Sequence, residues 1–118
     1  MTAEQANELA RTWIEAWNAH DMDAILAHYT DDFEMTTPYI VSIMNDPTGT
    51  LKGKQVVGDY WRKALNAYPD LHFTLDNVYA TVNAVGITYR SVKNRQALEV
   101  LMFNTEGKVH KAFGCYAD

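Results

Sequence analysis

Apolar residues recur with helical spacing at the start of the chain. One face of a helix expected over residues 3–19 carries large apolar side chains four residues apart: Leu9, Trp13 and Trp17. Asp21 follows this stretch and can cap a second helix over residues 22–29, because its carboxylate can accept the free amide hydrogens two or three residues later. The pattern therefore predicts two consecutive helices joined by a tight break.

A third helical pattern follows Gly53 and ends at Pro69. Its broad apolar face carries these side chains: Val56, Val57, Tyr60, Trp61, Ala64, Leu65 and Tyr68. Between the second and third helices, residues 33–37 predict a strand that Pro38 interrupts, because proline lacks a backbone donor. Residues 39–44 either extend the sheet or form a flap, and the pattern favours neither.

The second half of the chain has the spacing of β-hairpins. We expect strands over residues 71–81, 86–92, 96–105 and 109–117. Turns are expected at residues 82–83 or 83–84, at 93–94 and at 106–107. Helices followed by antiparallel strands indicate an α+β fold, and 118 residues predict a single domain over residues 1–118.

The last hairpin predicts which residues share a face of the sheet. If Glu106 and Gly107 form a two-residue turn, Glu99 lies opposite Gly114 and Phe103 lies opposite His110. One face then carries Glu99, Leu101, Phe103, His110, Ala112, Gly114 and Tyr116. The small residues Ala112 and Gly114 leave room on this face for a ligand. A turn of another length would exchange the faces on one strand.

The opposite face of the same hairpin carries a run of apolar side chains: Leu98, Val100, Met102, Phe113 and Cys115. Antiparallel sheets normally present a polar outer face, so this patch predicts a homodimer through the outer face of the sheet. In the opposite register these residues fill the core instead, and the protein needs no second copy.

Composition excludes several classes of function. The formal net charge of −5 argues against nucleic-acid binding, which needs a basic patch. No apolar run approaches the roughly 20 residues that span a bilayer, and the N-terminus lacks a basic and then apolar leader. We therefore expect a cytoplasmic protein with no membrane partner. Cys115 is the single cysteine, and the histidines lack zinc-site spacing, so we expect neither a metal nor a cofactor.

The first third of the chain has a recognisable order of elements. A helix with two tryptophans is followed by a break at Asp21, an acidic turn at Asp31 and Asp32, and a strand from Phe33. This order resembles the opening of the NTF2-like superfamily, in particular its SnoaL-like and ketosteroid-isomerase-like branch. The resemblance covers nearly the whole chain. It implies an NTF2-like (cystatin-like) cone, in which three N-terminal helices pack on a curved antiparallel or mixed sheet and enclose a pocket.

Glu99 lies in an otherwise apolar strand, shortly before the turn Asn104–Lys108. In the ketosteroid isomerases that the chain resembles, the matching position holds an aspartic acid that stays neutral and donates a hydrogen bond. The resemblance thus implies an acid role for Glu99, because burial would raise the pKa of its carboxyl. The alternative is a structural glutamate at a strand edge or paired with Arg90 or Arg95.

The other isomerase groups are missing from this sequence. Trp13 stands where the family has a tyrosine, and Thr37 stands before Pro38 where the family has its catalytic aspartate. Steroid isomerisation by the family's usual route is therefore not expected. His110 is the candidate general base, because it is the one histidine with an inward predicted face. The alternative is that His110 is exposed near the hairpin turn.

Aromatic residues supply the predicted ligand-binding set: Trp13, Trp17, Tyr29, Tyr60, Phe103 and Tyr116. Aromatic side chains at helical spacing also pack cores, which is the alternative interpretation. A cavity with several polar aromatic tips and one carboxyl suits a small, oxygenated, hydrophobic molecule. The resemblance implies an acid–base isomerase, cyclase or hydrolase acting on such a compound. The alternatives are a protein that binds it without turnover and a dimerising accessory module.

Overall fold

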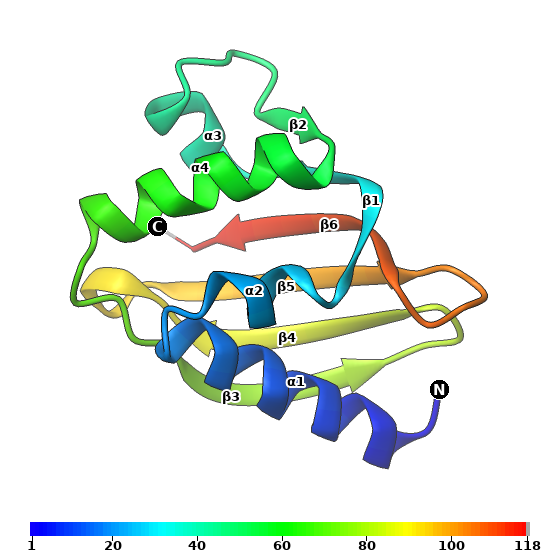
Figure 1. Ribbon diagram of the computed structural model, residues 1–118. Helices are drawn as coiled ribbons and strands as arrows, with labels where there is room; N and C mark the ends of the chain where they lie inside the picture. The colour runs from blue at the N-terminus through cyan, green and yellow to red at the C-terminus, as the bar shows by residue number, and fades with distance from the viewer. Residues whose placement is uncertain (118) are drawn as a thin grey trace.

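The computed structural model describes residues 1–117, and Figure 1 shows its helices in front of one continuous sheet. The elements in chain order are α1 (Ala3–Asn18), α2 (Met22–Leu26), β1 (Tyr29–Thr36), α3 (Pro38–Ile43), β2 (Thr50–Lys52), α4 (Lys54–Ala67), β3 (Thr74–Ala80), β4 (Ala84–Arg90), the 3₁₀ helix η1 (Val92–Asn94), β5 (Gln96–Phe103) and β6 (Val109–Tyr116). The expected α+β class is confirmed.

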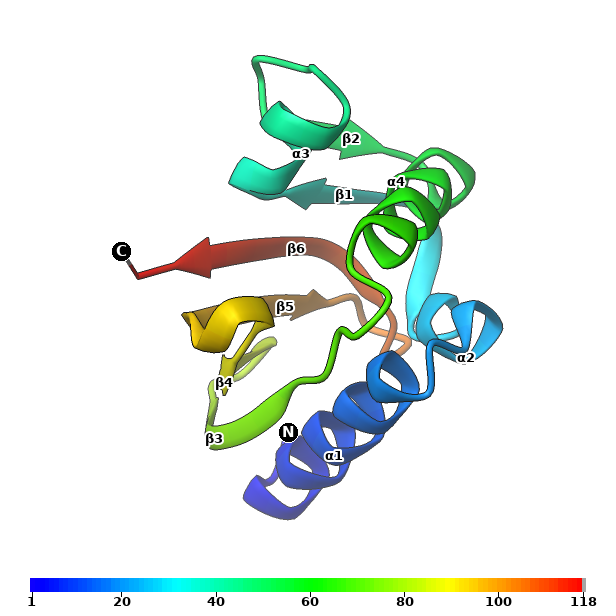
Figure 2. The same cartoon turned by 90° about the vertical axis from the view of Figure 1, so that its left-hand side faces the viewer.

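The six strands are ordered β2-β1-β6-β5-β4-β3, and their neighbours are antiparallel except for the parallel pair β1 and β6. Figure 2 shows the sheet curving around α1, α2 and α4, which lie on its concave side. α1 packs against β3, and α4 packs against β1. In the described part of the chain no helix is long and apolar enough to cross a membrane.

The ends of the helices follow the chemistry of their capping residues. Thr2 and Gln5 form a reciprocal capping box at the start of α1. Asp21 caps α2 as predicted, since its Oδ1 accepts a hydrogen bond of 3.1 Å from the amide of Ala24. α4 begins after Gly53, whose φ of 106° is a conformation that other residues rarely adopt.

Residues 39–44 do not extend the sheet. Most of them belong to α3, a short helix that begins at Pro38 and is capped by Thr37, whose hydroxyl accepts from the amide of Tyr39 at 3.4 Å. Proline fits the first position of a helix because the amide there has no partner within the helix. The strand that pairs with β1 at this edge of the sheet is β2, which follows α3 in the chain.

The predicted register of β5 and β6 is confirmed along most of the hairpin and wrong near the turn. Glu99 pairs with Gly114 as predicted, but Phe103 pairs with Val109 and not with His110. The connection is longer than a two-residue turn, because the Asn104 side chain accepts from the amides of Glu106 and Lys108. A bulge between Met102 and Phe103 absorbs the difference, and His110 is therefore exposed.

Candidate functional site

A cavity of about 50 Å³ lies between the helices and the concave face of the sheet. α1, α3 and α4 supply one side of its wall, and β1, β4, β5 and β6 supply the other. The wall includes four of the aromatic residues predicted from the sequence, together with the predicted acid: Trp13, Trp17, Tyr60, Tyr116 and Glu99. The inner-face pattern of the sequence thus brings five of the predicted site residues to one cavity, and their role in binding stays a prediction.

Two predicted ligand-binding residues, Tyr29 and Phe103, do not belong to this wall. Tyr29 is fully buried behind it, where its hydroxyl accepts a hydrogen bond of 3.1 Å from Nε1 of Trp13. Phe103 lies at the far end of β5, next to the loop that leads to β6. Tyr29 therefore holds a wall residue in place, and Phe103 fills the core.

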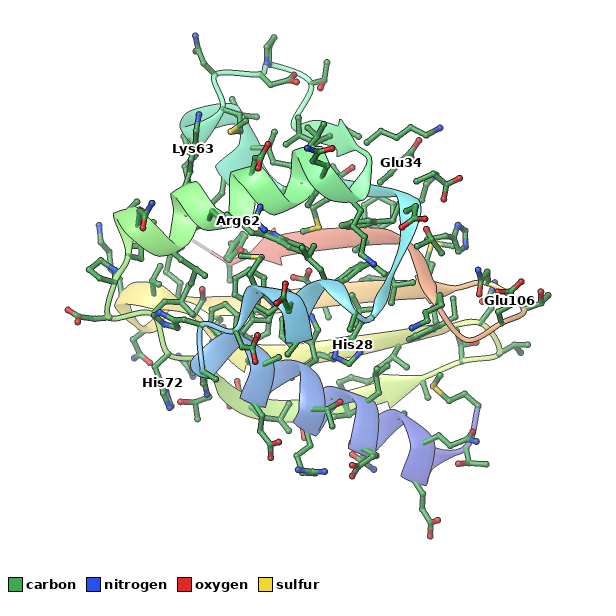
Figure 3. All side chains as sticks on the ribbon, viewed as in Figure 1. His28, Glu34, Arg62, Lys63, His72 and Glu106 are labelled. Atoms are coloured by element: carbon green, nitrogen blue, oxygen red, sulfur yellow. The ribbon has the colours of Figure 1, made fainter. Side chains whose placement is uncertain are left out.

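The structure does not bring His110 to the cavity. Its side chain is exposed on β6, close to the loop after β5, and the inward position expected from a two-residue turn is wrong. In Figure 3, Glu106 marks the tip of that loop, at one end of the molecule. A general base in the cavity must therefore be another group.

Glu99 occupies the position that the sequence analysis predicted for it. It is 4% exposed, and Oε1 accepts a hydrogen bond of 3.3 Å from the hydroxyl of Tyr89. Burial raises the pKa of the Glu99 carboxyl to about 8, although the hydrogen bond from Tyr89 lowers it in part. The carboxyl is therefore mostly protonated at pH 7 and can donate a hydrogen bond.

The arginines considered as structural partners of Glu99 have other contacts. Nε of Arg90 lies 3.8 Å from a carboxylate oxygen of Asp76, and Nη1 of Arg95 donates to the hydroxyl of Tyr39 at 3.0 Å. The Arg95 guanidinium also lies 4.9 Å from the centre of the Tyr116 ring. Tyr39 and Tyr116 are partly exposed, so this cluster connects the cavity wall with the surface.

Sequence reasoning missed Tyr89, the hydrogen-bond partner of Glu99. The signal was available, because buried residues alternate along β4 and Tyr89 shares the inward face with Val85 and Ile87. Ile87 is the direct neighbour of Glu99 across the strands. A tyrosine two residues further along this face lies within reach of the carboxyl.

The wall also carries several hydroxyl groups. Burial raises the pKa of the hydroxyls of Tyr60, Tyr89 and Tyr116 above its ordinary value, and the nearby Glu99 adds to the rise. Hydrogen bonding with the Thr37 side chain lowers the pKa of Tyr60 and of Tyr116 in part. These hydroxyls stay neutral near pH 7, so they can donate and accept hydrogen bonds but cannot supply charge.

Trp17 brings a different polar group to the wall. It is 5% exposed, and its Nε1–H is a buried donor without a hydrogen-bond partner among the described residues. Its ring contacts the rings of Trp13, Trp61 and Phe73. The cavity thus combines an aromatic surface, one protonated carboxyl and one unused indole donor.

Comparisons with known proteins agree with this arrangement. A family model described as the SnoaL-like domain matches residues 10–108. A SnoaL-like protein of unknown function from Burkholderia thailandensis is 51% identical, with a TM-score of 0.95, over 99% of this chain and 98% of that chain. No protein among those with curated descriptions matches this sequence.

More distant solved structures share the fold. A proposed isomerase of the SnoaL-like family from Agrobacterium tumefaciens is 18% identical, with a TM-score of 0.78, over 98% of this chain and 99% of that chain. A protein with a cystatin-like fold from Methylobium petroleophilum is 16% identical, with a TM-score of 0.79, over 100% of this chain and 79% of that chain. At such identities the likeness establishes the fold alone.

Proposed function

Because the chain belongs to the SnoaL-like domain family and has its NTF2-like, cystatin-like fold, we propose that its cavity binds a small oxygenated hydrophobic compound on which Glu99 acts as an acid. The observation that carries this proposal is the buried, mostly protonated Glu99 carboxyl on an aromatic wall. In a site with little water, a hydrogen bond from such a carboxyl stabilises negative charge that develops on a carbonyl oxygen.

The size of the cavity limits the ligand. A cavity of about 150 Å³ can hold benzene, and this one measures about 50 Å³. A ligand larger than a few heavy atoms therefore displaces side chains, and the rings of Tyr39, Tyr68 and Tyr116 have room to move because they are partly exposed. The T-shaped contact between the rings of Tyr39 and Tyr68, with centroids 6.2 Å apart, opens in that case.

The proposed reaction is an isomerisation, cyclisation or hydrolysis assisted by proton donation from Glu99. Thr37 does not replace the missing base, because its hydroxyl caps α3 and has no useful basicity near pH 7. The base is then a water molecule or the Glu99 carboxylate itself, which forms after the proton has been donated. Because both of these bases are weak, such a site suits a substrate in which the proton to be removed is already acidic.

Binding without turnover is the second candidate function. It is favoured by the composition of the wall, since Glu99 is its one carboxyl in the described part of the chain and no histidine joins it. An acid–base reaction normally uses two titratable groups with separate roles. Both candidate functions involve the same ligand. They differ only in whether the protein converts the ligand or releases it unchanged.

Metabolite capture tests both candidates. The immobilised protein is incubated with a cell extract, and mass spectrometry identifies the small molecules retained by the native chain and by Glu99→Gln. Glu106→Gln is the matched control, because Glu106 lies in the exposed loop between β5 and β6. We expect neutral oxygenated compounds that Glu106→Gln retains and Glu99→Gln loses.

The fate of a retained compound then separates the two functions. Conversion by the native chain but not by Glu99→Gln supports an enzyme, and release of the unchanged compound supports a binding protein. If every retained compound is also retained by Glu99→Gln, the carboxyl does not contact the ligand and the proposal is wrong.

A further inference from the structure

We propose that the ligand of this cavity carries a second hydrogen-bond acceptor, which accepts from the indole Nε1–H of Trp17. This inference rests on the proposed function and narrows its ligand to neutral compounds with two separated acceptors, such as diketones and keto esters. One acceptor faces Glu99, and the other faces Trp17.

The unused indole donor is the first observation. Trp17 lines the cavity and is 5% exposed, yet its Nε1–H has no partner among the described residues. Leaving a buried donor unsatisfied costs free energy, so most such groups in proteins are paired. Trp13 lies one turn earlier on α1 and follows this rule, since its Nε1–H donates to Tyr29 at 3.1 Å. This inference assigns the missing partner of Trp17 to an acceptor on a ligand in the cavity that Trp17 lines.

The arrangement of the rings separates this donor from Glu99. Trp13 and Phe73 are stacked, with centroids 5.7 Å apart and planes 21° apart. The Trp17 centroid lies 6.3 Å from that of Trp13 and 5.6 Å from that of Phe73. The Tyr89 centroid lies 5.3 Å and 4.7 Å from the same two rings, and Tyr89 donates to Glu99. An apolar surface thus lies between two polar groups.

The charge of the wall indicates neutral acceptors. Lysine, arginine and histidine are absent from the described residues that line the cavity, and the Glu99 carboxyl is mostly protonated. A carboxylate or phosphate inside this cavity would lie among uncharged lining residues, because the Arg95 guanidinium lies against the rings of Tyr39 and Tyr116 and is not part of the lining. Burying such a charge without a direct partner is costly. Carbonyl and ether oxygens accept hydrogen bonds without carrying charge, so they suit both donors.

One arrangement within the protein competes with this inference. Trp17 and Trp61 are nearly perpendicular, with an interplanar angle of 82° and centroids 5.2 Å apart. If the Nε1–H of Trp17 points at the face of the Trp61 ring, a weak N–H···π contact satisfies it in part. No acceptor on the ligand is then needed.

Titration with matched ketones distinguishes these arrangements. The probes are hexane-2,5-dione and octane-2,7-dione, each compared with the monoketone of the same chain length, hexan-2-one or octan-2-one. We expect Trp17→Phe to weaken binding of at least one diketone about fivefold, the effect of one lost hydrogen bond, and to change monoketone binding less than about twofold. Trp61→Phe is the comparison variant, because it removes another indole from the same wall and leaves the Nε1–H of Trp17 in place, so the difference between diketone and monoketone should persist.

A second readout uses the native chain and does not depend on the folding of a variant. In protein labelled with ¹⁵N, the indole N–H signal of Trp17 should move downfield when a diketone binds and stay in place with a monoketone. Equal weakening of diketone and monoketone by Trp17→Phe would overturn the inference, as would an unmoved Trp17 signal under saturation with diketone.

The outcomes also separate this inference from the proposed function. Monoketone binding that needs Glu99, together with diketone binding that is no tighter, contradicts the second acceptor and leaves the proposed function standing. Failure of the native chain to bind any of the ketones counts against both. Diketone binding that needs both Trp17 and Glu99 supports both.

Discussion

Gly114 lies directly opposite Glu99 in the β5–β6 pair, and a side chain at this position would meet both Thr37 and the Glu99 carboxyl. A Cβ at Gly114 would lie 3.4 Å from Oε1 of Glu99 and 3.2 Å from Oγ1 of Thr37. Thr37 is itself buried and caps α3. One glycine therefore lets the acid, the α3 cap and β6 meet on the cavity wall.

This relationship predicts that Gly114→Ala is destabilising. The added methyl group forces Thr37 to move, and we expect the free energy of unfolding to fall by about 1–3 kcal/mol, as for other overpacked cores. Urea unfolding of the native and variant chains measures it. Gly86→Ala on β4 is the control, because its nearest contact would be an ordinary 3.6 Å to Leu98. If both substitutions change the free energy of unfolding equally, the close contact between position 114 and Thr37 does not limit the size of the side chain.

The raised pKa of Glu99 predicts a pH dependence of stability. The carboxyl has a pKa near 4.5 when exposed and about 8 in the folded chain. Between these values the folded state binds more protons than the unfolded state, so stability falls as the pH rises from about 4.5 to about 8. The slope attributable to Glu99 is at most about 1.4 kcal/mol per pH unit.

Urea unfolding at several pH values within this window, with the native chain and Glu99→Gln, isolates the effect of the carboxyl. We expect the native chain to lose stability relative to Glu99→Gln as the pH rises, because glutamine has no proton to release. His28, whose pKa burial lowers, titrates in both chains and cancels in the difference. Parallel curves for the two chains would show that Glu99 is ionised in the folded state.

Glu99 could be predicted from the sequence because strand alternation fixes it relative to Gly114 across a regular ladder. His110 could not, because its direction depends on how many residues the loop contains. The length of the loop is set by hydrogen bonds that the Asn104 side chain accepts from the amides of Glu106 and Lys108. The alternation of apolar residues along the strands does not predict these hydrogen bonds. The unused donor of Trp17 also escaped prediction, since helical spacing gives the face of a side chain and not the partner of its N–H.

α3 escaped prediction for another reason. Its six residues complete fewer than two turns, too few for an apolar period to appear. The combination of Thr37 and Pro38 is nevertheless a helix start, with a capping hydroxyl followed by proline at the first position. The apolar residues after Pro38 left an extension of the sheet open beside a flap, because their composition suits a strand.

Tyr29 is predicted to stabilise the wall and not to bind the ligand. Tyr29→Phe removes the acceptor for Nε1 of Trp13 and leaves a buried donor unsatisfied. We expect the free energy of unfolding to fall by about 1–3 kcal/mol. Tyr79→Phe is the control, because Tyr79 is 61% exposed, and it should change stability by less than about 0.5 kcal/mol. Retention of ligands by folded Tyr29→Phe should match the native chain, and loss of retention would return Tyr29 to the binding set.

The outer face of the sheet is predicted to form a homodimer. Val100 pairs with Phe113 and Leu98 with Cys115, and these residues alternate along β5 and β6 with the buried residues of the inner face. Leu98, Val100 and Phe113 are half-buried and Cys115 is exposed. A two-fold axis would join identical patches and remove them from water. We expect light scattering at micromolar concentration to give the mass of two chains for the native protein.

Val100→Asp tests which surface joins the two chains. An unpaired aspartate buried in the interface by each chain would disfavour association, so we expect the mass of one chain with an unchanged circular dichroism spectrum. Val82→Asp makes the same substitution in the turn between β3 and β4, where Val82 is 88% exposed, and should leave the mass at two chains. A native mass of one chain would contradict the dimer. A native dimer that persists in Val100→Asp would place the interface on another surface.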